Sequence, residues 1–251
     1  MEIRVVTWNM AYWSHKAMHE EAWSYLLDKI NADFVLVQES KITGFLENDS
    51  NFLWHKAGET PGRKDWGNGI YSKKYQLTQE TENSIDCWNR DRFNELCIVA
   101  NTKVNKDTKL TLISLYGRMD KVGTEVYCMT NLHRILSDLT GIFNGHYGKR
   151  EIILGGDLNA SIQCDEQWGG EAHKIFFDRL SDFRLKNCFE LKGYKGYVQT
   201  HRHHKSTLTW QNDYFFISKS LGKKFKECEI LDNNDIRRYS DHNPVIIKLN
   251  I

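Results

Sequence analysis

The chain has 251 residues, of which 40% are hydrophobic and 27% charged, and its formal net charge at pH 7 is +1. Twelve Phe, eleven Tyr and eight Trp supply large areas for burial, and the length suits a single domain over residues 1–251. The near-zero charge excludes a polybasic nucleic-acid coat and an acidic tail, so an anionic partner would have to be bound by local patches.

The cysteines and the start of the chain point to a reduced, cytoplasmic protein. The cysteines are widely spaced and form no Cys-x-x-Cys pair of the kind that binds zinc or carries redox chemistry: Cys87, Cys97, Cys128, Cys164, Cys188 and Cys228. No long apolar stretch follows a basic start, so neither a signal peptide nor a membrane span is expected.

The first predicted elements are a strand, a helix and a second strand. An apolar strand runs from Ile3 to Asn9, and apolar residues then recur at helical spacing from Trp23 to Ile30. The segment "ADFVLVQES" predicts a dense apolar strand that ends at Glu39.

The middle of the chain reads as strands in succession. "WGNGIYSKK" (66–74) and "FNELCIVANTKV" (93–104) are predicted strands separated by a polar loop, and "KLTLISLYG" (109–117) is another that ends at Tyr116. Hairpin-like connections are expected here.

Helices return in the second half. Apolar residues from Val126 to Leu139 define one face of a helix that closes near Gly141, and the strand "EIILGGDLN" follows it. A further helix is expected around 176–183, then the strand "DYFFIS" and a final strand from 245 with one wholly apolar face. Runs of strands with interspersed helices predict a mixed-sheet α/β sandwich.

Polar residues stand at the ends of these strands. They are Asn9, Glu39, Tyr116, Asp157 with Asn159, and Asp213, while Asp241 and His242 precede the last strand. Side chains at strand ends can converge on one rim of a sheet without disturbing its core, so the pattern predicts one acidic cleft. Taken singly, each has a structural alternative as a turn residue, a solvated carboxylate or a packed aromatic.

Order and spacing together identify a family. "TWNM", "VQES", "SLYG", "GGDLNA", "TWQNDYFFIS" and "YSDHNPV" occur in an order that resembles the endonuclease/exonuclease/phosphatase superfamily, which includes the exonuclease III-like abasic-site nucleases. The resemblance runs from the first strand to the last residues. It implies an α/β fold, a four-layer α/β/β/α sandwich with two mixed β-sheets and a site at one rim. "GNGIYSKK" is similar to the family's Gly-containing hairpin of the second sheet.

The resemblance implies a metal site. By similarity, Glu39 would be the principal ligand of Mg²⁺, for which Mn²⁺ could substitute, and Asn9 would support it. Asp241 would bind the metal directly or through water. Carboxylates suit such a hard cation, which keeps several waters and needs only one or two protein carboxylates.

The other motifs imply catalytic residues. Asp157 would orient or deprotonate the attacking water, and Asn159 would hold that water or a phosphate oxygen. His242 would contact the scissile phosphate, with Asp213 orienting its imidazole and raising its basicity. Tyr116 would donate a hydrogen bond to the phosphate.

The loop after Tyr116 departs from the family pattern. The abasic-site nucleases have a Pro-Asn step there, whereas this chain has Gly117-Arg118-Met119. Arg118 is therefore a candidate phosphate contact, although a solvated surface arginine is an equal alternative.

The loop before Asp213 bears on the substrate. It contains His201, Arg202 and, three residues before the aspartate, Trp210. Cations with an aromatic at this place fit a nucleic-acid backbone and a stacking contact. The histidines could instead bind a transition metal or belong to an ordinary polar loop.

These observations predict a Mg²⁺-dependent phosphodiesterase that hydrolyses nucleic acid, with DNA favoured over RNA. Because the superfamily also contains phosphatases, a phosphatase on a small molecule such as an inositol phosphate is the second hypothesis. A catalytically silent binding module is the third.

Overall fold

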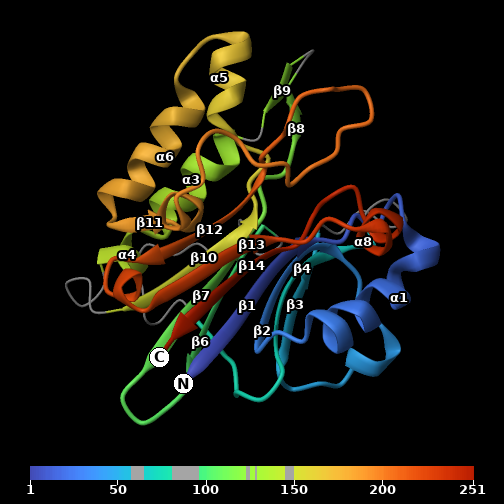
Figure 1. Cartoon of the computed structure of the whole chain (residues 1–251), viewed down its shortest axis with the longest axis vertical. Helices are drawn as coiled ribbons and strands as arrows, with labels where there is room; N and C mark the ends of the chain where they lie inside the picture. The colour runs from blue at the N-terminus through green and yellow to red at the C-terminus, as the bar shows by residue number, and fades with distance from the viewer. Residues whose placement is uncertain (58–64, 81–95, 123–124, 128, 145–149) are drawn as a thin grey trace.

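Two stacked β-sheets lie between two layers of helices (Figure 1). The computed structural model describes residues 1–57, 65–80, 96–122, 125–127, 129–144 and 150–251. The first sheet has the order β13-β14-β1-β2-β4-β3 and the second the order β11-β12-β10-β7-β6-β5. Both are mixed, since β1 pairs in parallel with β2 and β10 with β7, whereas the other pairs are antiparallel. The predicted α/β fold with two mixed sheets is confirmed.

The first sheet is formed by strands from the beginning and the end of the chain, and the second by strands from its middle. Those of the first sheet are β1 (Glu2–Asn9), β2 (Phe34–Ser40), β3 (Phe52–Lys56), β4 (Gly67–Ser72), β13 (Phe225–Ile230) and β14 (Val245–Asn250). Those of the second are β5 (Thr78–Gln79), β6 (Cys97–Lys103), β7 (Lys109–Leu115), β10 (Glu151–Asp157), β11 (Leu185–Asn187) and β12 (Asp213–Ser218). A separate hairpin pairs β8 (Asp120–Val122) with β9 (Glu125–Tyr127).

The helices form the outer layers. They are α1 (His19–Ser24), α3 (Met129–Asp138), α4 (Thr140–Asn144), α5 (Ile162–Trp168), α6 (Ala172–Asp182), α7 (Cys188–Lys192) and α8 (Asn234–Tyr239). A π-helical turn, η2 (Tyr25–Ile30), continues α1, and single 3₁₀ turns are η1 (Lys16–Met18), η3 (Gly44–Leu46) and η6 (Leu221–Lys223).

Alternation along β14 shows how each strand of the first sheet serves two cores. Val245, Ile247 and Leu249 belong to the core between the sheets, whereas Ile246 belongs to a second core beneath α1, η2 and α8. Successive side chains of a strand point to opposite faces, so a strand covered on both sides is apolar on both. The predicted apolar face of the last strand is therefore its inter-sheet face.

The second sheet is covered by α3 and α6 (Figure 1). Phe176 and Leu180 of α6 are fully buried, as the spacing predicted. The predicted helix starting at Val126 is wrong at its N-terminal end, because Val126 lies in β9 and α3 begins at Met129. Pairing with β8 takes that segment, which overrides its helical spacing.

The middle strands divide between the sheets. β6 and β7 form the expected hairpin, and residues 93–95 of the predicted strand lie outside the described residues. β4 contains the segment expected in the second sheet, but it pairs with β2 and β3 in the first. That placement corrects the expectation drawn from "GNGIYSKK".

Two further expectations concern cysteines and membranes. Cys97, Cys164, Cys188 and Cys228 are free thiols, and Cys87 and Cys128 lie outside the described residues. In the ranges that the structure describes, every helix is too short or too polar to cross a bilayer.

Strand directions bring the polar strand ends to one rim. β14 runs antiparallel to β1, from Glu2 opposite Asn250 to Thr7 opposite Val245, so both chain termini lie at one end of the sheet (Figure 1). The end of β1 and the start of β14 lie at the other end. In the second sheet Asp157 at the end of β10 is paired with Asp213 at the start of β12.

Candidate active site

Hydrogen bonds between the two sheets join the predicted residues. Asn9 Nδ2, at the end of β1, donates to Asp157 Oδ2 in β10 over 2.8 Å. The Tyr116 hydroxyl, just after β7, donates to Glu39 Oε1 in β2 over 2.7 Å. Segments far apart in the sequence therefore meet at one rim of the sandwich.

A β-bulge turns Glu39 into this cluster. The register of β2 against β4 shifts between Val37 and Ser40, and Glu39 has a φ of 45°, which is in the left-handed region. Regular alternation would point its side chain away from the second sheet, since Gln38 already donates to Ser114 of β7. The bulge directs the carboxylate back toward Tyr116, at the cost of a strained backbone.

Two glycines allow the close approach of β7 and β10. A Cβ on Gly156 would lie 1.7 Å from the Leu115 carbonyl oxygen, and one on Gly117 would lie 1.9 Å from the Leu158 carbonyl oxygen. The Gly117 amide also donates to the carbonyl oxygen of Asp157 over 2.8 Å. A proline could not make that bond, so the departure from the family's Pro-Asn step has a local reason.

Asp157 is completely buried and accepts several hydrogen bonds. The backbone amide of Asn159 donates to its Oδ1 over 2.9 Å, and the Asn159 side-chain amide donates to Oδ2 over 3.0 Å. Burial raises the pKa of Asp157 to about 7, with the negative charge of Asp213 adding to the shift and the positive charge of His242 opposing it. A carboxylate with such a pKa can exchange a proton near neutral pH.

His242 lies between two aspartates. Its Nδ1 donates to Asp213 Oδ2 over 2.9 Å, and its Nε2 is 4.0 Å from Asp157 Oδ2. Burial by itself would lower the pKa of His242, but the negative charges of Asp213 and Asp157 outweigh it and raise that pKa to about 10. The imidazole is thus a cation at neutral pH, and its orientation is set by Asp213.

Two side chains that the sequence reasoning did not single out, those of Ser240 and Trp8, hold His242 in place. The Ser240 hydroxyl accepts from the His242 amide over 3.0 Å and donates to the Asn9 carbonyl over 2.7 Å. The Trp8 indole donates to the His242 carbonyl over 3.0 Å. Ser240 and Trp8 lie within the quoted motifs, so their position beside Asn9 and His242 was the available signal.

Asp213 is held from its backbone. Thr200 Oγ1 accepts from the amides of both Asn212 and Asp213, over 2.9 and 3.0 Å. The Oδ1 atom of Asp213 is buried and has no hydrogen-bond partner among the described residues. No sequence pattern pointed to Thr200, because a lone threonine thirteen residues before the first residue of a strand is ordinary.

Glu39 is 8% exposed, so its carboxylate is largely removed from water. Burial raises its pKa, while the hydrogen bond from Tyr116 and the positive charge of His242 oppose the rise and the charge of Asp241 adds to it. Burial also raises the pKa of Tyr116 well above its ordinary value, so its hydroxyl stays a donor. A buried carboxylate near a second carboxylate, with only these partial compensations, fits a hard divalent cation.

The geometric groups of possible metal ligands only partly match the predicted set. Among the described residues, two sets of three have ligand atoms within 4.8 Å of one another: His201, Asp241 and His242, and Asp157, Asp213 and His242. Glu39 is in neither set. Its link to Asp241 is electrostatic, whereas Asp241 contacts His201, with 3.9 Å between Oδ2 and Nε2.

His201 stacks on His242. Their ring centroids are 4.4 Å apart and the ring planes differ by 19°. Burial, together with the positive charge of His242, lowers the pKa of His201 to about 3. The neutral ring therefore offers packing and hydrogen bonds to the site but no charge, which differs from the cationic substrate contact suggested by its place in a basic loop.

The remaining predicted substrate contacts have different surroundings. Arg202 is turned inward, where its guanidinium donates to Asn243 Oδ1 and the Ser240 carbonyl and lies 3.5 Å from Asp232. These contacts give Arg202 a structural role and leave its predicted phosphate contact without support. Arg118 is half-buried beside Tyr116, whose carbonyl accepts from its amide over 3.1 Å.

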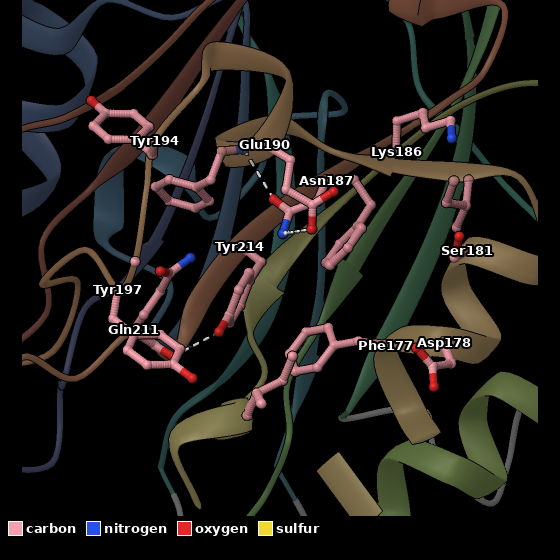
Figure 2. A pocket seen from close by; sticks show the side chains of 15 residues that line it. Phe177, Asp178, Ser181, Lys186, Asn187, Glu190, Tyr194, Tyr197, Gln211 and Tyr214 are labelled. Atoms are coloured by element: carbon pink, nitrogen blue, oxygen red, sulfur yellow. Dashed lines mark hydrogen bonds between the residues drawn. The ribbon is translucent and has the colours of Figure 1, made fainter. Parts of the chain in front are cut away.

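A pocket of about 390 Å³ lies on the other face of β12 (Figure 2). Tyr214 lines it together with Phe177 of α6 and Tyr197, and its hydroxyl donates to the Gln211 carbonyl over 3.0 Å. Because side chains alternate along β12, Tyr214 points away from the face that carries Asp213. This aromatic pocket is separate from the rim with the acidic residues.

Comparison with solved structures gives several matches to the whole fold. The endonuclease domain of the telomere-specific non-LTR retrotransposon TRAS1 matches with a TM-score of 0.68 and 16% identity, covering 100% of this chain and 99% of that one. The AP endonuclease LMAP from Leishmania major matches with a TM-score of 0.71 and 14% identity, covering 100% and 88%. The 3' phosphatase NExo from Neisseria, bound to a product DNA hairpin, matches with a TM-score of 0.70 and 18% identity, covering 99% and 100%.

This chain has the fold of the endonuclease/exonuclease/phosphatase superfamily. The resemblance found in six short motifs is thus confirmed at the level of the fold. At the level of sequence, no family model and no curated protein matches the chain. The endonuclease/exonuclease/phosphatase fold places the ends of β1, β2, β10 and the starts of β12 and β14 at one rim, where the acidic cluster lies.

Proposed function

We propose that this protein is a Mg²⁺-dependent nuclease that hydrolyses phosphodiester bonds of nucleic acid, with DNA favoured over RNA. The observation that carries the proposal is the position of His242, whose Nδ1 is 2.9 Å from Asp213 and whose Nε2 is 4.0 Å from Asp157. This arrangement puts a fixed cation beside a carboxylate that titrates near neutrality. Folding alone does not require it, since buried charges cost free energy unless they are paired.

Asp157 and His242 have complementary roles in hydrolysis. Asp157 takes a proton from the attacking water, whose oxygen forms the new bond to phosphorus as the bond to the leaving oxygen breaks. Asn9 and Asn159 donate hydrogen bonds to Asp157 and so hold its carboxylate in one orientation. The cationic imidazole of His242 faces the phosphoryl oxygens, where negative charge builds up in the transition state.

Glu39 would be the principal ligand of the metal ion, with Asn9 in support and Asp241 binding directly or through water. Its raised pKa and near-complete burial support this role, because an adjacent cation would offset the cost of its charge. When bound, Mg²⁺ neutralises the phosphoryl oxygens and supports the departing oxygen. Mn²⁺ could take its place. Tyr116 holds Glu39 through its hydroxyl and lies close enough to this rim to contact the phosphate as well.

The choice of nucleic acid rests on analogy and on the rim. The structures with the same fold include AP endonucleases and a 3' phosphatase bound to DNA, and these names describe those proteins. In this chain Trp210 and the exposed Lys205 lie in the loop next to His242, which suits a nucleic acid better than a compact inositol phosphate. The fold by itself accommodates both substrates.

A substrate panel tests the proposal. The protein is incubated with labelled single-stranded, duplex and abasic DNA, with RNA and with inositol polyphosphates, in Mg²⁺ or EDTA. We expect strand cleavage of nucleic acid that requires Mg²⁺ and is fastest on a DNA substrate. Release of inorganic phosphate from the small molecules alone would sink the nuclease assignment, and inertness toward every substrate would favour the silent module.

A substitution tests the mechanism. His242→Ala should lower turnover by at least about two orders of magnitude, the scale of one lost transition-state contact. His133→Ala is the control, since His133 contacts the Ala172 carbonyl in the outer helical layer. Turnover that is unchanged in His242→Ala would remove His242 from the mechanism.

A further inference from the structure

Trp168 is an exposed tryptophan at the end of a helix. Its side chain is 72% exposed, which exceeds every other large hydrophobic residue that is exposed in the described part of the chain. α5 ends there because Gly169, with a φ of 79°, donates its amide to the Asp165 carbonyl over 2.8 Å and turns the chain away. The indole is held at a fixed helix terminus with most of its surface in water, where it is accessible to a ligand.

Trp210 holds one face of Trp168. The ring centroids are 5.9 Å apart and the planes differ by 17°, which is a stacked arrangement. Trp210 itself is half-buried, and its indole nitrogen donates to Ser206 Oγ over 2.9 Å. The pair is therefore oriented before any ligand arrives, and the outer face of Trp168 stays in solvent.

The stacked pair is connected to the catalytic rim by strand-like pairing. Trp210 is opposite His201 in an antiparallel bridge, and His201 is opposite His242 in another. Residues directly opposite each other point to the same side, as the stacked rings of His201 and His242 confirm. With about 4.8 Å between neighbouring strands, the Trp210 backbone is roughly 10 Å from that of His242.

We propose that the outer face of Trp168 binds an unpaired nucleobase of the substrate, in a stack supported by Trp210. The inference rests on the proposed nuclease function, because it assumes a phosphate at His242. The base concerned belongs to a nucleotide near the scissile phosphate, because the two bridges connect Trp210, on which Trp168 stacks, with His242. Since a base within a duplex has no free face, the protein prefers single-stranded or locally opened nucleic acid.

The surroundings favour a nucleobase over an apolar protein partner. Every base has a flat face that stacks on an indole regardless of sequence, whereas a lone indole beside a polar loop is a small target for a protein. Lys205 is exposed next to Ser206 and can meet the adjoining phosphate. Asp165 of α5 is a carboxylate near this site, and it already accepts a hydrogen bond from the backbone amide of Lys174 over 2.7 Å.

Binding in EDTA separates stacking from catalysis. Fluorescence anisotropy is measured with two labelled DNA oligonucleotides of equal length, one normal and one whose sugars carry no bases. Trp168→Ala should weaken binding of the normal single strand by about tenfold and leave binding of the base-free strand unchanged. Trp168→Phe should retain most of the affinity, because a phenyl ring still stacks.

Tyr194→Ala is the matched control, since Tyr194 is 39% exposed but lines the pocket on the other face of β12. It should bind both oligonucleotides as the unmodified protein does. Equal affinity of Trp168→Ala and the unmodified protein for the normal strand, or equal losses on both strands, would overturn the stacking site. Cleavage by the unmodified protein in Mg²⁺ is measured in parallel, and its absence would instead overturn the nuclease function.

Discussion

Two buried histidines, one just before β14 and one in α1, have pKa values shifted in opposite directions. His242 is 5% exposed and His19, at the start of α1, is 3% exposed. The aspartates beside His242 outweigh burial and raise its pKa to about 10. At His19 burial dominates and lowers the pKa to about 4, with the charge of Lys41 adding to the fall.

The contacts explain the difference. His19 Nε2 accepts from the Lys41 amide over 3.0 Å, which suits a neutral ring. His242 donates to a carboxylate, which suits a cation. A histidine that serves folding is thus kept neutral by burial, whereas the rim collects charges that folding alone would avoid.

Left-handed backbone conformations also occur at the rim. Of the five non-glycine residues with a left-handed φ among the described residues, Ala11, Glu39 and Asn159 lie at or just after strand ends of the rim, whereas Asn31 and Arg184 follow helices. Strain of this kind persists only where the surrounding structure imposes it, and it is frequent at functional sites.

The largest expected effect comes from making His242 resemble His19. Asp213→Asn removes the negative charge that raises the pKa of His242 most, so the imidazole loses its proton at lower pH and its tautomer is no longer fixed. Turnover at pH 8 should fall by about a hundredfold or more, the usual range for general acid–base and orienting groups. The alkaline limb of the pH–rate profile should also move to lower pH.

The profile is measured under single-turnover conditions from pH 6 to 10. Asp178→Asn is the control, because Asp178 is an exposed carboxylate of α6 that pairs with Lys174 and makes no contact with His242 among the described residues. An alkaline limb that stays in place in Asp213→Asn would mean that His242 does not set it.

The second effect concerns stability at His19. In the unfolded chain the imidazole takes up a proton near pH 6.5, whereas the folded protein resists protonation until about pH 4. Stability should therefore fall as the pH falls through this window, by up to about 3 kcal/mol for this group. His19→Gln removes that part of the pH dependence.

Urea unfolding at pH 7.5 and pH 4.5 measures it. The loss of unfolding free energy between these pH values should be smaller in His19→Gln than in the unmodified protein. His15→Gln, at a more exposed histidine of the same segment, should behave like the unmodified protein. Equal losses in all three proteins would contradict the assignment of a neutral buried ring at His19.

The sequence predicted the frame of the fold because its signals are local. Dense apolar strands such as β2, β10 and β14 follow from runs of three or four apolar residues, and α6 follows from helical spacing. The short elements β5, β11 and α7 carry no such pattern and were missed. They exist through tertiary pairing, which propensity does not encode.

The candidate site was predictable as a set of residues but not as a geometry. Motif order indicated Asn9, Glu39 and Asp157, whose side chains do meet at the rim. The bulge that turns Glu39 inward and the inward turn of Arg202 depend on contacts between distant segments. The basic loop in the sequence therefore suggested a phosphate contact for Arg202, whereas in the structure its guanidinium bonds to Asn243 and the Ser240 carbonyl.

The smallest expected effect is a gain in stability at Glu39. Its carboxylate is 8% exposed and its pKa is raised by burial, so in the absence of metal its charge costs folding free energy. Glu39→Gln keeps the shape and an acceptor for Tyr116 while removing the charge, and should raise the free energy of unfolding in EDTA by roughly 1 kcal/mol.

Thermal melts with and without Mg²⁺ measure both the effect of the charge and the effect of the metal on stability. The unmodified protein should gain stability on adding Mg²⁺, and Glu39→Gln should not, because it has lost the ligand that makes binding favourable. If Glu39→Gln instead melts lower than the unmodified protein in EDTA and responds equally to Mg²⁺, Glu39 is a structural carboxylate like those outside the rim.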